Sequence, residues 1–250
     1  MKRILAALLF AGVAGTTAAQ APAALRADMI ALDRAYIPAL VVTNRADAQV
    51  AARAMNALTA QWRSFEARYA GVAAGDPKWA ASLKDVDGYI GRANGIVAEG
   101  KDLPAAHDQL EGMRGTLLGA RDRMKMPYYL DGLTRYHDRM EAIYLAARGK
   151  DAATLEDTAI ALIRGELPDA EAWWRAARAQ PIEPELAVTP QRQAEIDAYY
   201  ARIDRSLADL RAALSGTDKG AMAKAAQGVR PPFSALFASF GDFGPVQAKQ

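Results

Sequence analysis

Apolar residues recur along almost the whole chain at spacings of three and four positions, which is the period of an amphipathic α-helix. Runs of β-branched residues, which favour strands, are scarce, and alanine is abundant. The pattern therefore predicts an all-α protein. Eight helices are expected, at about residues 25–42, 47–69, 77–99, 104–124, 129–148, 151–174, 190–214 and 220–240.

Glycine and proline mark the expected helix ends. Between the third and fourth helices, Gly100 suits a left-handed C-terminal cap, Asp102 an N-cap and Pro104 the first helical turn. Pro38 lies inside the first helix and predicts a kink there, because its ring removes a backbone hydrogen bond. Glycine and proline in the segment 165–168 predict a break in the sixth helix.

The expected helices fall into two sets that match after an offset of about 110 residues. Short connections favour antiparallel neighbours. We therefore expect a tandem pair of antiparallel four-helix bundles, with residues 20–126 forming the first and residues 127–250 the second. The matched positions are Trp62-Arg63 with Trp174-Arg175, and Met113-Arg114 with Val229-Arg230.

The first 19 residues have the layout of a secretory signal peptide. Lys2 and Arg3 form a basic start, residues 4–13 form a short apolar core, and Ala19 offers a small residue for cleavage. We expect cleavage after Ala19 and a periplasmic or secreted location for residues 20–250. No later stretch is apolar over the ~20 residues that a bilayer requires, so no membrane span is expected in the mature chain.

Charge and cysteine content narrow the functional classes. Loss of Lys2 and Arg3 lowers the formal net charge from +2 to 0, and no basic cluster remains, so nucleic-acid binding is not expected. The chain contains no cysteine, which excludes disulfides, thiolate metal ligands and thiol nucleophiles. Ser-His-Asp spacings, Gly-rich phosphate loops and H-E-x-x-H sequences are also absent, so we do not expect an enzyme.

The two histidines of the chain lie in the same local pattern. The segments "LPAAHDQLEGMR" and "LTRYHDRMEAIY" each place a glutamate four positions after the histidine, which gives the pairs His107–Glu111 and His137–Glu141. Residues four apart share one helix face, so each pair can bind one side of a metal ion. On a helical wheel both pairs lie at the border of the apolar stripe.

The pairs lie on consecutive expected helices, the fourth and the fifth. If these helices form an antiparallel hairpin around Pro127, Glu111 and Glu141 lie within one turn of the same height, at about 1.5 Å of rise per residue. The two histidines then flank them on opposite sides. Arg114 and Arg121 fall within the apolar stripe of the fourth helix. Arg114 is placed either to orient Glu111 or to neutralise it.

Imidazole and carboxylate ligands suit a divalent transition metal such as iron, zinc or copper. We therefore predict that the metal ion is the partner of this protein, with a protein partner as a second candidate. The predicted ligands are His107, Glu111, His137 and Glu141. One alternative is a scaffold or interaction protein in which the His-Glu pairs only stabilise the junction. A second is b-type haem held by Met29 and His107, because the expected bundle is similar in architecture to soluble periplasmic b-type cytochromes.

Overall fold

The computed structural model describes residues 23–44, 47–71 and 76–247. Every regular element in these ranges is helical and none is a strand, so the expected all-α class is confirmed. The expected signal peptide lies outside the described residues. Within them, no helix combines the length and the apolarity needed to cross a membrane. The elements are α1 (Ala23–Thr43), α2 (Ala48–Tyr69), α3 (Trp79–Glu99), α4 (Leu103–Arg123), α5 (Tyr129–Ala147), α6 (Asp157–Ala179), the 3₁₀ turn η1 (Pro184–Leu186), α7 (Pro190–Ser215), α8 (Lys219–Gly228), α9 (Arg230–Ala238) and α10 (Gly244–Gln247).

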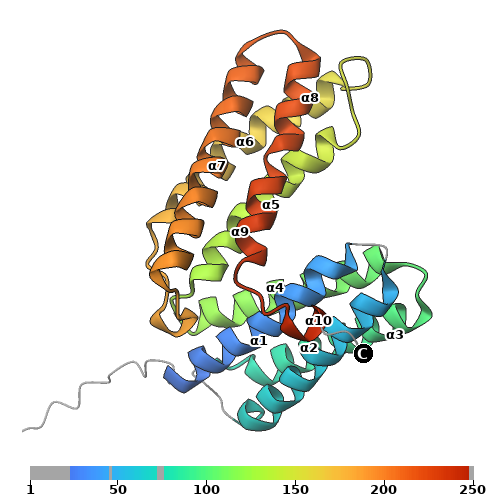
Figure 1. Cartoon of the computed structure of the whole chain (residues 1–250), viewed down its shortest axis with the longest axis vertical. Helices are drawn as coiled ribbons and strands as arrows, with labels where there is room; N and C mark the ends of the chain where they lie inside the picture. Colours follow the sequence, from blue (N-terminus) through green and yellow to red (C-terminus); the bar gives the residue numbers. More distant parts are fainter. Residues whose placement is uncertain (1–22, 45–46, 72–75, 248–250) are drawn as a thin grey trace, which may run out of the picture.

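The helices form two groups that meet at a junction (Figure 1). In the first group, α1 packs on α2 and α4, and α3 packs on the same two helices. In the second group, α5 packs on α6, α8 and α9, and α7 packs on these three helices as well. The groups meet where α1 contacts α9 and η1. After α9 the chain returns to the first group, where α10 packs on α2 (Figure 1).

The expected hairpin of the fourth and fifth helices is absent. α4 and α5 do not pack along their lengths, and α5 runs away from α4 into the second group (Figure 1). At the turn, Lys125 has a positive φ of 52° and Tyr128 is extended, which redirects the chain. Each helix also buries its apolar face elsewhere, α4 against α3 and α1, and α5 against α6 and α8. The register derived from a hairpin is therefore wrong.

Two further boundaries differ from the expected ones. The sixth helix begins at Asp157, because the Asp151 side chain accepts two backbone N–H groups and closes a turn before it. It then continues through Gly165 and Pro168, which lie on its exposed face, where water can bond the carbonyl that proline leaves free. The eighth expected helix is divided at Val229 into α8 and α9, because two prolines follow at once.

Pro38 leaves α1 unbroken because the far end of the chain replaces the missing hydrogen bond. Pro38 has no N–H to offer the Arg34 carbonyl, and the backbone N–H of Asp242 donates to that oxygen instead, at 2.8 Å. The approach is close. A Cβ at Gly241 would lie 2.8 Å from Ile37 Cγ2 and 3.0 Å from Pro38 Cδ. Glycine at this position therefore lets the C-terminal segment dock on α1.

The change Gly241→Ala tests this docking. The added methyl group would force apart two well-packed segments, and we expect the free energy of unfolding to fall by about 1–3 kcal/mol. Chemical denaturation followed by circular dichroism measures it. Gly165→Ala is the matched control, since open space surrounds that exposed helical glycine. The control should be stabilised by up to about 1 kcal/mol. Equal stability of the parent and Gly241→Ala would contradict the role given to this glycine.

Candidate functional site

Two histidines and two arginines surround a small cavity where the two helix groups meet. Its volume is about 50 Å³, enough for a few water molecules or a small ion. Three helices of the junction, α1, α4 and α9, supply most of its wall, and α5 supplies one histidine. The lining residues are Leu40, Val41, Asn44, His107, Glu111, Arg114, His137, Arg230, Phe233, Ser234 and Phe237.

The His107 ring has one nitrogen bonded and the other free. Nδ1 lies 2.9 Å from the Leu40 carbonyl oxygen, which requires the proton on Nδ1 and leaves a lone pair on Nε2. Nε2 is 3.4 Å from Oε1 of Glu111. The amide nitrogen of Asn44 is 3.0 Å from both ring nitrogens. An atom that lay in the ring plane at 3.0 Å from both nitrogens would collide with Cε1, the carbon between the two nitrogens. The Asn44 amide nitrogen therefore lies over the face of the ring.

The His137 ring has the opposite tautomer. Arg114 Nη2 lies 2.8 Å from Nδ1, and because arginine can only donate, Nδ1 carries the lone pair and Nε2 the proton. Nε2 is 3.9 Å from Oε2 of Glu141. Burial lowers the pKa of both His137 and His107 below the usual histidine value, and the Arg114 charge lowers the pKa of both further. Both imidazoles are therefore neutral at pH 7.

The two glutamates are only partly satisfied. Glu111 pairs through Oε2 with Arg114, but its Oε1 is buried and has no hydrogen-bond partner among the residues that the structure describes. Glu141 Oε2 is also buried without a hydrogen bond, 3.5 Å from Nε of Arg230. A buried acceptor left without a partner costs about 1–3 kcal/mol. Both oxygens thus have unused capacity to bind a donor or a cation.

The predicted ligands come close together, though not as one finished ligand set. His107, Glu111 and His137 line the cavity, and Glu141 lies behind His137, outside it. Among the described residues, no three histidine, aspartate or glutamate side chains converge closely enough to hold a metal ion. The guanidinium of Arg114 lies between Glu111 and His137 and contacts both.

Met29 does not face this cavity. His107 contacts α1 at Leu40, eleven residues after Met29, which corresponds to about 16 Å along the helix axis. Two axial ligands of one haem iron lie much closer together than that. The pairing of Met29 with His107 is therefore incompatible with this arrangement.

The part of the cavity formed by α9 was not among the predicted site residues. Arg230, Phe233 and Phe237 reach the site from more than 90 residues beyond His137 in the sequence, and local patterns carry no information about such contacts. The Arg114 guanidinium lies over the Phe237 ring, 5.9 Å from the centre of that ring. One sequence signal did exist, because the offset of about 110 residues matches Arg114 with Arg230.

A second group of buried charges lies beside the cavity. Arg121 donates to both carboxylate oxygens of Asp131, at 2.5–3.1 Å, and its guanidinium lies 4.2 Å from the ring centre of Tyr128. The Tyr128 hydroxyl donates to Asp33 at 2.5 Å. Burial raises the pKa of Asp33, and the Arg121 charge opposes that rise. This group joins α1, α4 and α5 and is closed to solvent.

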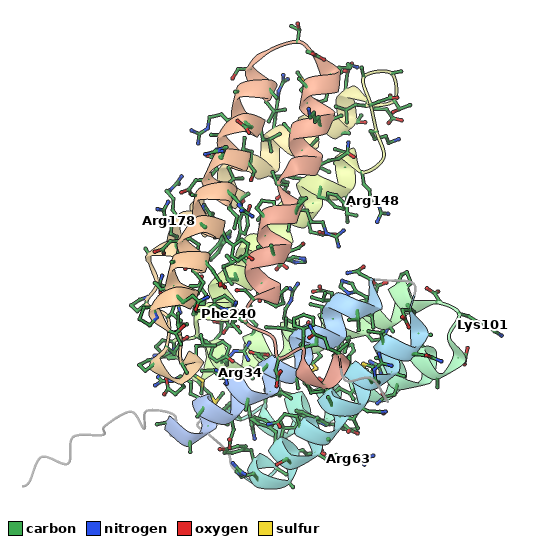
Figure 2. The ribbon with its side chains drawn as sticks, in the orientation of Figure 1. Arg34, Arg63, Lys101, Arg148, Arg178 and Phe240 are labelled. Atoms are coloured by element: carbon green, nitrogen blue, oxygen red, sulfur yellow. The ribbon has the colours of Figure 1, made fainter. Side chains whose placement is uncertain are left out.

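A larger cleft of about 450 Å³ is lined by residues that include Arg34 and Phe240, both labelled in Figure 2. Its two arginines are already engaged. Arg34 donates to the Leu186 carbonyl, and Arg192 donates to the Ser239 carbonyl and pairs with a glutamate. These contacts hold η1 against α1, and the first turn of α7 against the end of α9. The arginines of this cleft therefore have a structural role.

Comparisons of the chain with protein-family models, curated proteins and solved structures found no match. The histidine cavity is therefore the feature of the molecule from which a function can be proposed.

The change Asp33→Asn tests how much the burial of an ionised Asp33 carboxylate destabilises the fold. A carboxyl group whose folded pKa is raised destabilises the fold once it is ionised, so the parent should lose stability as the pH rises through the folded pKa of Asp33. Asparagine keeps an acceptor for Tyr128 and carries no charge. We expect the variant to be at least as stable as the parent at pH 8, with a smaller advantage at pH 4. Urea denaturation at the two pH values measures this, and a variant less stable than the parent at pH 8 would contradict it.

Proposed function

We propose that this chain is an exported, non-enzymatic helical-bundle protein that binds a divalent transition metal where its two helix groups meet. One observation carries the proposal. Among the described residues, Glu111 Oε1 is buried without a hydrogen-bond partner, and it lies 3.4 Å from Nε2 of His107, which carries a free lone pair. A cation is the ligand that satisfies carboxylate oxygens and imidazole lone pairs together.

The His107–Glu111 pair supports the proposal most directly. Its ligand atoms lie 3.4 Å apart. Two ligands on a tetrahedral ion with bonds of about 2.1 Å are separated by about the same distance. The second ring nitrogen of His107 donates to the Leu40 carbonyl, which is the usual anchor of a metal-binding histidine. Iron, zinc and copper all accept such ligands, and zinc is the convenient probe because it has no redox chemistry.

The proposal includes a tandem origin for the fold, with antiparallel four-helix bundles at residues 20–126 and 127–250. The matched tryptophans support it. Trp62 on α2 donates its indole N–H to Asp87 on α3 at 3.2 Å, and Trp174 on α6 donates to Asp204 on α7 at 2.7 Å. The same contact thus recurs between the second and third helices of each half. In this arrangement the metal joins the last helix of the first half to the first helix of the second.

A scaffold role is the second candidate, and Arg114 favours it. Its guanidinium pairs with Glu111, donates to His137 at 2.8 Å and is 7% exposed. A network of this kind can fix the angle between two helices without a metal. In that case the histidines contribute to stability, and a binding partner uses some other surface of the protein.

The deciding prediction concerns zinc. Protein comprising residues 20–250, prepared without a histidine tag and stripped of metal with a chelator, should bind zinc in the micromolar range by isothermal titration calorimetry. Bound metal should also raise the melting temperature. The changes His107→Ala and His137→Ala each remove an imidazole from the site, and each should weaken binding by about tenfold or more.

Asp108→Asn is the matched control, because Asp108 adjoins His107 in the sequence but is exposed. It should bind zinc as the parent does. A parent protein that binds no zinc in the micromolar range would refute the metal site, and so would histidine variants that bind as tightly as the parent. Histidine variants that lose stability in a protein that binds no metal would instead establish the scaffold role.

A further inference from the structure

Arg114 occupies the place between the groups that would ligate a metal. Its Nη2 pairs with Glu111 Oε2 and lies 2.8 Å from His137 Nδ1, so one nitrogen of the guanidinium contacts an acceptor from each half of the protein. The side chain is 7% exposed and lies over the Phe237 ring. Arg230, the other arginine of the cavity, approaches Glu141 instead.

We propose that Arg114 is an internal cation that occupies the metal site when it is empty and leaves it when the metal binds. This inference rests on the proposed function and specifies its ligands. An ion that replaced Nη2 would meet the Glu111 carboxylate and the Nδ1 lone pair of His137. Glu111 in turn lies beside Nε2 of His107. On this proposal, His107, Glu111 and His137 form one ligand set once the guanidinium moves away, although the three are not close enough to hold an ion while Arg114 is in place.

The tautomers of both histidines agree with this ligand set. His107 has its proton on Nδ1, bonded to Leu40, and its lone pair on Nε2. His137 has its lone pair on Nδ1, facing Arg114, and its proton on Nε2, on the side of Glu141. A carboxylate beside the protonated nitrogen of a ligating histidine orients the ring and raises its basicity. Glu141 is therefore a positioning residue rather than a ligand.

The displaced guanidinium has a second acceptor close by. Asp138 Oδ1 lies 3.9 Å from Arg114 Nη2, and the Asp138 side chain is 64% exposed. Arg114 can therefore exchange a buried partner for a solvated one while the metal takes over the link between α4 and α5. The metal ion must displace the positive charge of Arg114. The protein therefore binds the ion less tightly than the same ligands would bind it without the arginine. Such competition suits a protein that takes up and releases metal rather than one that stores it.

Zinc titration of Arg114→Met and Arg114→Lys tests the inference. Methionine keeps an unbranched side chain without charge, so this variant should bind zinc at least about tenfold more tightly than the parent, within the range of typical coupling between two sites. Its metal-free form should melt at a lower temperature, and zinc should raise that temperature more than it does in the parent. Lysine keeps a cation and should remain within about threefold of the parent.

Arg139→Met is the matched control for the loss of an arginine, because Arg139 pairs with Glu166 on α6, away from the cavity. It should bind zinc as the parent does. If the parent binds zinc and Arg114→Met binds no more tightly, the internal-cation inference is overturned while the metal site stands. If neither protein binds zinc, the proposed function itself fails. Circular dichroism confirms that each variant is folded before it is titrated.

A pair of glutamine variants tests the ligand assignment and leaves Arg114 in place. Glu111→Gln removes a proposed ligand and should weaken zinc binding by about tenfold or more. Glu141→Gln keeps a hydrogen-bond acceptor beside His137 Nε2 and should weaken binding less than Glu111→Gln does. Equal losses in the two variants would overturn the separate roles given to the two glutamates, even if Arg114→Met did not fold.

Discussion

Two buried arginines of α4 determine how the two helix groups of this protein meet. Arg114 and Arg121 lie two turns apart on the apolar face of α4, and each reaches a side chain of α5, His137 and Asp131 respectively. A buried guanidinium needs partners within hydrogen-bond distance, because a buried charge without one is costly. The start of α5 must therefore lie across the end of α4. The histidine cavity exists because of that crossing.

Local sequence patterns predict the parts of this fold that depend on neighbouring residues. Helical periodicity predicts the all-α class, and the position of Arg114 and Arg121 within an apolar stripe predicts their burial. The angle between α4 and α5 is a different matter, because it depends on which faces the other helices cover. A short connection allows a hairpin but does not require one. Here α4 packs mainly on α3, and α5 packs mainly on α6.

At Pro38 the local sequence predicts an irregularity that the complete fold removes. From the local sequence, a proline inside a helix predicts a kink, since the carbonyl four residues earlier loses its donor. In the structure that carbonyl, on Arg34, receives the N–H of Asp242 from the other end of the chain. The helix remains continuous because a residue more than 200 positions away completes it. Only the close approach at Gly241 makes this contact available, and no local rule connects that glycine with Pro38.

The candidate site also has parts that the local sequence predicts and parts that it does not. Each His-Glu pair was predictable because residues four apart share a helix face, and the half-buried position of both histidines agrees with their place at the border of the apolar stripe. The contribution of α9 was not predictable from local spacing. The tautomers also had to come from the structure, because they depend on Leu40 and on Arg114.

The neighbouring ion pair of Arg121 and Asp131 offers a contrast within the same junction. Both carboxylate oxygens of Asp131 accept hydrogen bonds from Arg121. Glu111, in the same junction and also paired with an arginine, keeps one buried oxygen without a partner, beside the free lone pair of a neutral His107. A network that served only to hold two helices would gain about 1–3 kcal/mol by satisfying that oxygen. Its unused capacity, next to a second unused acceptor, favours a cation as the missing partner.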